Sequence, residues 1–138
     1  YHLGQVIRSS AGQFLVIDFE GEPARPLSAR RAHHSPLRDV AGMLRSFAYA
    51  AAVGAAESRG ADERADQWER RARDAFLRGY FRDPVGGAQH ILPASRANAE
   101  RLIALFETEK TFYELQYELD HRPDWAWIPL SGIAKLTA

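Results

Sequence analysis

The sequence predicts a mainly α-helical domain that begins with a short β-hairpin. Two runs of β-favouring residues, Val6–Ile7 and Phe14–Ile17, flank a turn cluster at Ser9–Gly12, whose glycine can take a positive φ. From Ser35 onward, apolar residues recur at intervals of three and four over three long segments, which is the period of amphipathic helices. A lone hairpin is marginal in water, so we expect it to lean on these helices or on a further part of the protein.

A loop is predicted between the hairpin and the first helix, over Gly21–Ser35, because glycine and proline interrupt it. The loop carries a basic patch that either contacts phosphate or faces only solvent, made of Arg25, Arg30, Arg31, His33 and His34. The first helix is predicted from Ser35-Pro36, a capping residue followed by a proline suited to a first turn, to about Ala56.

Two further helices follow. The second is predicted over Ala61–Arg82, with Trp68 and Phe76 on its apolar face. The third begins at Ser95 and ends before Pro123, because the residue that precedes a proline disfavours helical geometry. The tail from Trp125 onward is predicted to be partly helical.

Composition narrows the class of protein. The 138 residues suit one domain, and 46% of them are hydrophobic, enough for an ordinary core. Lys plus Arg equals Asp plus Glu, 18 of each, so no overall field favours nucleic acid or an anionic membrane. The absence of cysteine excludes disulfides and thiolate chemistry and fits a cytoplasmic protein. No apolar run reaches the roughly 20 residues of a membrane-spanning helix.

Gln5 and Asp18 are the first candidate site. Gln5 precedes one hairpin strand and Asp18 follows its partner, so antiparallel pairing brings both to the open end of the hairpin. An amide oxygen and a carboxylate suit magnesium held together with substrate phosphates. The alternative is an aspartate that caps a turn and a solvated glutamine.

The same stretch resembles the catalytic segment of the aminoglycoside-phosphotransferase and protein-kinase-like superfamily. That pattern is His-Gly-Asp-x-His-x-x-Asn/Gln, a short hairpin, and Ile-Asp-Phe/Trp-Glu, matched here by "YHLGQ" and "VIDFEGEP". The likeness is greatest to the maltokinases, which are often fused to trehalose synthase. Their "HLGQV", "IDFEGEP" and "SPLRDVAGMLRSF" are matched by residues 2–6, 17–23 and 35–47. Their "EK-x-x-YEL-x-YE" and "RP-x-W" are matched by residues 109–118 and 122–125.

The resemblance implies an incomplete C-terminal lobe of a kinase-like fold. Residues 1–20 would be the catalytic-loop and metal hairpin, and residues 35–138 the helical subdomain. The general base is then expected just before Tyr1, with no catalytic residue in the chain itself, and the chain alone should be inactive. The helix that precedes the catalytic loop in such lobes is also expected to be missing. Its absence should leave some helix faces partly bare and favour self-association, at Leu44, Phe47, Leu102 and Phe106.

The resemblance also assigns roles around the hairpin. Gln5 and Asp18 would hold Mg²⁺ on the phosphates of ATP, and Glu20 would reach a second metal or water, or brace the loop. His2 would support the loop or a phosphate, or be a structural histidine. Asp39 would tie down the catalytic loop, although an aspartate in a first helical turn also suits the helix dipole.

A sugar site is expected at the end of the third helix. Aromatic faces and carboxylates suit sugars, and the resemblance assigns substrate binding to Tyr113, Glu114, Tyr117, Glu118, Arg122 and Trp125. The alternative is that the aromatic residues are core and the glutamates are solvated. Trp127 would continue the same chemistry, and Arg38 either reaches a sugar hydroxyl or lies on the surface. Asp120-His121 departs from the paired amides expected here, which leaves contacts at that point open.

By this resemblance the parent protein transfers the γ-phosphate of ATP to maltose and forms maltose 1-phosphate. Two alternatives stay open: a kinase for another small sugar or amino-alcohol, and a non-catalytic kinase-like module that docks onto a trehalose synthase. No nucleic-acid or membrane partner is expected. The residue encoded before Tyr1 discriminates between these classes, because an aspartate there favours the enzyme.

Overall fold

The computed structural model describes residues 1–19, 26–58, 62–82 and 91–136. The chain begins with a 3₁₀ turn, η1 (Leu3–Gln5), and a hairpin of two antiparallel strands, β1 (Val6–Arg8) and β2 (Phe14–Val16). The register pairs Val6 with Val16. Gly12 takes a φ of 80° at the turn, as a glycine does readily. The predicted hairpin is confirmed.

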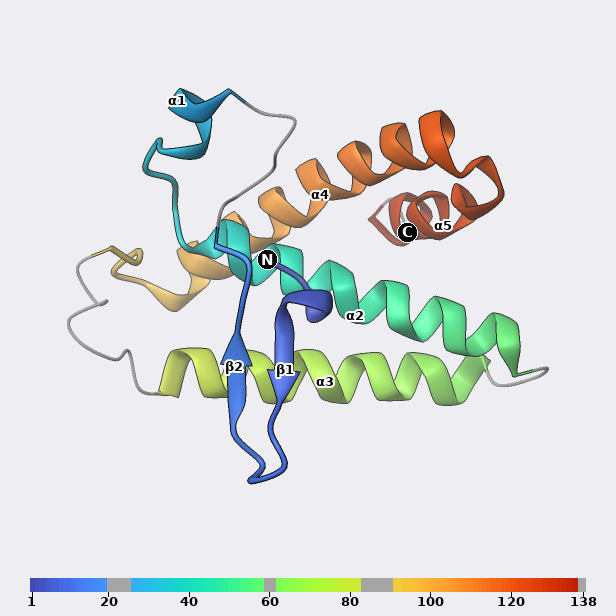
Figure 1. Cartoon of the computed structure of the whole chain (residues 1–138), viewed down its shortest axis with the longest axis horizontal. Coiled ribbons are helices and arrows are strands. Elements are labelled where there is room, and N and C mark those ends of the chain that lie inside the picture. Colours follow the sequence, from blue (N-terminus) through green and yellow to red (C-terminus); the bar gives the residue numbers. More distant parts are fainter. Residues whose placement is uncertain (20–25, 59–61, 83–90, 137–138) are drawn as a thin grey trace.

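Three long helices form the body of the molecule (Figure 1). They are α2 (Leu37–Glu57), α3 (Asp62–Arg82) and α4 (Arg96–His121). Each lies within one or two residues of its predicted bounds. Ser95 caps α4 by accepting a hydrogen bond from the Asn98 N–H at 3.1 Å.

Two regions hold more helix than expected. Within the predicted loop, α1 (Leu27–Arg30) forms one turn, in which the Arg30 N–H donates to the Pro26 carbonyl at 3.1 Å. A proline at the start of a turn favours this geometry, which the loop interpretation overlooked. The tail folds into η3 (Pro123–Trp125) and α5 (Trp127–Leu136), and α5 packs against α4.

The core lies where α2 packs between α3 and α4. Leu44 is fully buried and Phe47 nearly so, with the Phe47 ring edge-on to Trp68 and Phe76 of α3. The expectation of bare faces at Leu44 and Phe47 is therefore wrong, because α3 and α4 cover this side of α2. Leu102 and Phe106 are half-buried at the edge of the core.

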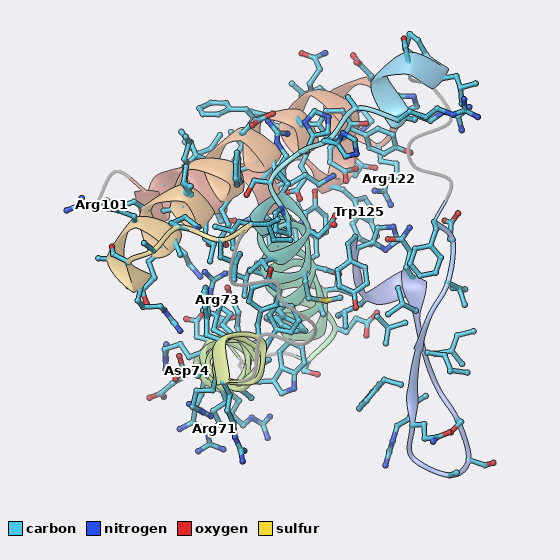
Figure 2. All side chains as sticks on the ribbon, turned by 90° about the vertical axis from the view of Figure 1, so that its left-hand side faces the viewer. Arg71, Arg73, Asp74, Arg101, Arg122 and Trp125 are labelled. Carbon is cyan, nitrogen blue, oxygen red and sulfur yellow. The ribbon has the colours of Figure 1, made fainter. Side chains whose placement is uncertain are left out.

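Exposed apolar side chains gather instead on the hairpin, whose turn end projects away from the helices (Figure 2), although Val6 packs against the core. They are Ile7, Phe14, Leu15, Val16, Ile17 and Phe19. Self-association of the chain stays a prediction, and this surface is now where we expect it. None of the described helices has the length and hydropathy needed to cross a membrane.

Candidate functional site

Gln5 and Asp18 meet at the open end of the hairpin, as their places in the sequence predict. The Gln5 side-chain amide donates to the Asp18 carbonyl oxygen at 3.0 Å and to its carboxylate at 3.3 Å. The Gln5 amide oxygen accepts the His2 backbone N–H at 3.1 Å. Both side chains are thus oriented by the turn that precedes β1.

Asp18 has a φ of 64°, the left-handed conformation that aspartate and asparagine tolerate better than most residues. It lies in the lining of a cavity of about 360 Å³ together with Tyr1, Gln5 and Asp39. The Asp18 carboxylate beside this cavity suits a hard cation such as Mg²⁺. Gln5 turns its amide nitrogen toward Asp18 and its oxygen toward the His2 N–H, so its amide would have to turn over to offer a metal its oxygen. Among the described residues, no three His, Asp or Glu side chains gather as a metal cluster, so this pair would need substrate oxygens to complete a site.

The segment before the hairpin rests directly on α2. A Cβ atom at Gly42 would lie 2.5 Å from the Tyr1 carbonyl oxygen, so only glycine lets this backbone approach the helix so closely. One turn further along α2, the Ser46 hydroxyl accepts the Leu3 N–H at 3.0 Å. The Asp39 carboxylate lies 3.7 Å from the Tyr1 nitrogen, so it faces this segment, and its bracing role stays a prediction.

His2 caps the 3₁₀ turn. Its Nδ1 accepts the Gly4 N–H at 3.1 Å, so the neutral ring carries its proton on Nε2. Partial burial lowers the pKa of His2 below its usual value, and the positive charges of the amino group at Tyr1 and of Lys110 act in the same direction. A ring that accepts through Nδ1 and donates through Nε2 can hold the turn and a bound substrate at once.

A histidine whose folded pKa is lowered binds fewer protons in the folded state than in the unfolded state. Its contribution to stability is therefore present above the unfolded pKa of about 6.5 and is lost as pH falls through the folded value. We expect an NMR titration of the His2 ring to give a midpoint below 6.5, with the Gly4 amide resonance moving in the same step. A midpoint at or above 6.5 would contradict the capping role.

Five of the six expected sugar-binding residues line one cavity of about 430 Å³. They are Tyr113, Glu114, Tyr117, Glu118 and Arg122. The sixth, Trp125, lies beside the cavity, with the Arg122 guanidinium 4.9 Å from its ring centre. His2, Lys110 and the α2 residues Gly42, Ser46 and Tyr49 complete the lining described here.

The two glutamates lie deep in this cavity and face α2. Glu114 contacts Arg45 through one oxygen, at 2.9 Å from Nε and 2.8 Å from Nη2. Burial raises the pKa of Glu114, although Arg45 opposes the shift. Glu118 is 2% exposed, and its Oε1 accepts both the Tyr49 hydroxyl at 3.0 Å and the Arg122 guanidinium at 2.7 Å. The alternative of solvated glutamates is wrong for both residues.

The aromatic members lie nearer the surface. Tyr117 and Trp125 are about two-fifths exposed, and the Arg122 guanidinium lies 5.7 Å from the Tyr117 ring centre. His121 stacks on Tyr117 at 4.4 Å between ring centres, at the point where paired amides were expected. Figure 2 labels Arg122 and Trp125 close together. The alternative of an aromatic core is wrong for Tyr113, Tyr117 and Trp125.

Other candidates lie elsewhere. Arg38 donates to Glu109 through Nη1 and Nη2 of its guanidinium, at 3.0 and 2.7 Å, which favours the surface interpretation. Trp127 lines a different cavity of about 330 Å³ among α2, α3, α4 and α5. Glu20 and Arg25 fall outside the described residues, and the linings of the two candidate cavities include none of the other basic-patch residues.

Residues of α2 were missed in the sequence. Gly42, Arg45, Ser46 and Tyr49 recur at three and four, so they form a stripe beside the apolar face. The available signal was Gly42 and Arg45 within the most apolar stretch of this helix.

The chain is similar in sequence to curated proteins named glucosamine kinase, which are sugar kinases. A glucosamine kinase of Mycolicibacterium smegmatis is 30% identical over 136 residues, which cover 98% of this chain and 32% of that protein. A glucosamine kinase of Streptacidiphilus jiangxiensis is 28% identical over 130 residues, covering 94% and 28%. No protein-family model matches the chain.

Solved glucosamine kinase structures share the fold. One crystal form superposes with a TM-score of 0.81 at 24% identity, over 99% of this chain and 33% of that one. A complex with glucosamine, ADP and inorganic phosphate gives a TM-score of 0.79 at 24% identity, over 100% and 32%. The chain therefore has the fold of one part of these kinases and spans about a third of their length.

Proposed function

We propose that this chain forms the sugar-binding and metal-binding part of an ATP-dependent sugar kinase. The observation that supports this most is the adjacency of the two cavities. The short segment before the hairpin joins them, because His2 lines the larger and Gln5 the smaller. A phosphoryl donor in one and an acceptor hydroxyl in the other would meet beside this segment, and positioning of this kind supplies most of the catalysis in phosphoryl transfer.

In this proposal the residues of the two cavities have different roles. Gln5 and Asp18 would hold Mg²⁺, which when bound neutralises charge on the phosphates. Arg122 and the aromatic rings around it would bind the sugar, and His2 would offer its Nε2 proton to the substrate. By the kinase-like motif, a residue that precedes Tyr1 in the complete protein would take the hydroxyl proton.

Maltose is the acceptor that we propose first, because the motifs at residues 17–23, 35–47 and 109–118 resemble those of maltokinases. Glucosamine is the second candidate, because the curated relatives carry that name. Transfer from ATP is supported by the ADP bound to one of the structural neighbours. If maltose is the acceptor, we also propose that the protein docks to a trehalose synthase domain, because maltokinases are often fused to one.

The test is a set of acceptor sugars given to the complete protein with Mg²⁺ and ATP, with ADP release and sugar phosphate measured together. We expect phosphate on the anomeric oxygen of maltose. Transfer to glucosamine alone would assign the second candidate, and release of ADP with no phosphorylated acceptor would contradict both. By the kinase-like resemblance the nucleotide-binding part and the general base would lie outside these 138 residues, which span about a third of the length of the relatives. We therefore expect no transfer by this chain alone.

A further inference from the structure

The buried carboxylate of Glu118 ties together two elements of the cavity wall. One oxygen, Oε1, accepts the Tyr49 hydroxyl from the middle of α2 and the Arg122 guanidinium from the end of α4. Glu118 and Arg122 are one helical turn apart, a spacing that favours such a pair. Tyr49 approaches from the neighbouring helix, so it fixes where this oxygen lies.

Arg122 is the exposed end of this arrangement. Its side chain is 48% exposed, whereas that of Glu118 is 2% exposed. The guanidinium lies near two aromatic rings, 5.7 Å from the ring centre of Tyr117 and 4.9 Å from that of Trp125. A sugar in the cavity would therefore meet Arg122 and the rings before it met the glutamate.

We infer that Glu118 and Tyr49 are positioning residues that hold the Arg122 guanidinium over the sugar cavity, and that Arg122 makes the sugar contact. This inference rests on the proposed function and changes the expected role of Glu118 from ligand to support. The arrangement would fix the direction of the guanidinium N–H groups that remain after the contact with Glu118. A planar guanidinium held in this way donates to neighbouring hydroxyl oxygens with defined geometry.

The energetics of Glu118 argue against a purely stabilising role for this residue. Its second oxygen, Oε2, is buried and has no hydrogen-bond partner among the described residues. A buried carboxylate with an unpaired oxygen costs folding free energy, so stability alone is a poor reason for it. Glutamine in its place would keep the volume and an acceptor for Tyr49 while removing the charge that holds Arg122.

The experiment is a double-mutant cycle in the complete protein, with Glu118→Gln, Arg122→Ala and the pair. We expect Glu118→Gln to raise the sugar KM about tenfold, equal to 1.4 kcal/mol, with the KM for ATP and the melting temperature nearly unchanged. Because Glu118 would act through Arg122, the pair should be no worse than Arg122→Ala alone. Tyr49→Phe should raise the sugar KM in the same direction and likewise add little to Arg122→Ala.

Two results would overturn the inference. Additive effects on the sugar KM would make Glu118 a direct ligand. A lowered melting temperature with both KM values unchanged in Glu118→Gln and Tyr49→Phe would make the pair packing residues. Either result leaves the kinase proposal intact, whereas the failure of that proposal would show as absence of transfer in the unsubstituted protein.

Discussion

Replacing Asp18 by asparagine should reduce phosphoryl transfer by the complete protein at least about a hundredfold, a barrier change of roughly 2.7 kcal/mol. The substitution removes the negative charge that would hold Mg²⁺ and keeps the volume of the side chain. The fold should survive, because asparagine accepts the left-handed conformation at this position, where φ is 64°. The rate of phosphoryl transfer and a melting curve, measured on the same preparation, check the loss of activity and the survival of the fold.

Asp74→Asn is the matched control, since Asp74 lies exposed on α3, a helix that contributes to neither candidate cavity (Figure 2). It makes the same chemical change and should leave the rate unaltered. If Asp18→Asn kept its rate within about tenfold of the unsubstituted protein, Asp18 would not be a metal ligand.

Gly42→Ala should cost about a hundredfold in rate, because misplacement of a reacting group by about 1 Å has effects of that size. The new Cβ would lie 2.5 Å from the Tyr1 carbonyl oxygen, and that atom belongs to backbone that cannot swing away as a side chain can. The segment that joins the two cavities would have to move off α2. We expect the variant to stay folded, with a melting temperature close to that of the unsubstituted protein, while its rate of phosphoryl transfer falls.

Gly54→Ala in the same helix is the control, because a Cβ there meets nothing within 4 Å. Alanine is favoured over glycine inside a helix by up to about 1 kcal/mol, so this variant should be slightly stabilised and fully active. Equal rates in the two variants would show that the close approach at Gly42 has no part in catalysis.

The helices and the hairpin followed from periodicity and turn residues, since both are local properties of the chain. The start of α2 and both ends of α4 were predicted to within one or two residues because Ser35-Pro36 marks the first and Ser95 and Pro123 mark the others. The expectation that Leu44 and Phe47 would be exposed was wrong. It assumed that these residues pack against the helix that precedes the catalytic loop in kinase-like lobes. Which faces α3 and α4 cover depends on tertiary packing, which no local pattern fixes.

The candidate site was predicted only where it depends on local properties of the chain. Gln5 and Asp18 come together because strand pairing forces it, and Tyr113 to Arg122 share a cavity because they occupy one end of one helix. The burial of Glu114 and Glu118 was not predictable, since it depends on Arg45 and Tyr49 reaching across from α2. Contacts that join residues 69 positions apart require the packed structure.

The most direct test of the central claim is transfer of labelled γ-phosphate from ATP to a sugar by the complete protein, compared with its Asp18→Asn variant. The account predicts a labelled phosphate on maltose or glucosamine with the unsubstituted protein, and almost none with the variant at an unchanged melting temperature. Equal labelling by both proteins, or no labelled sugar from a folded protein that binds ATP, would contradict it.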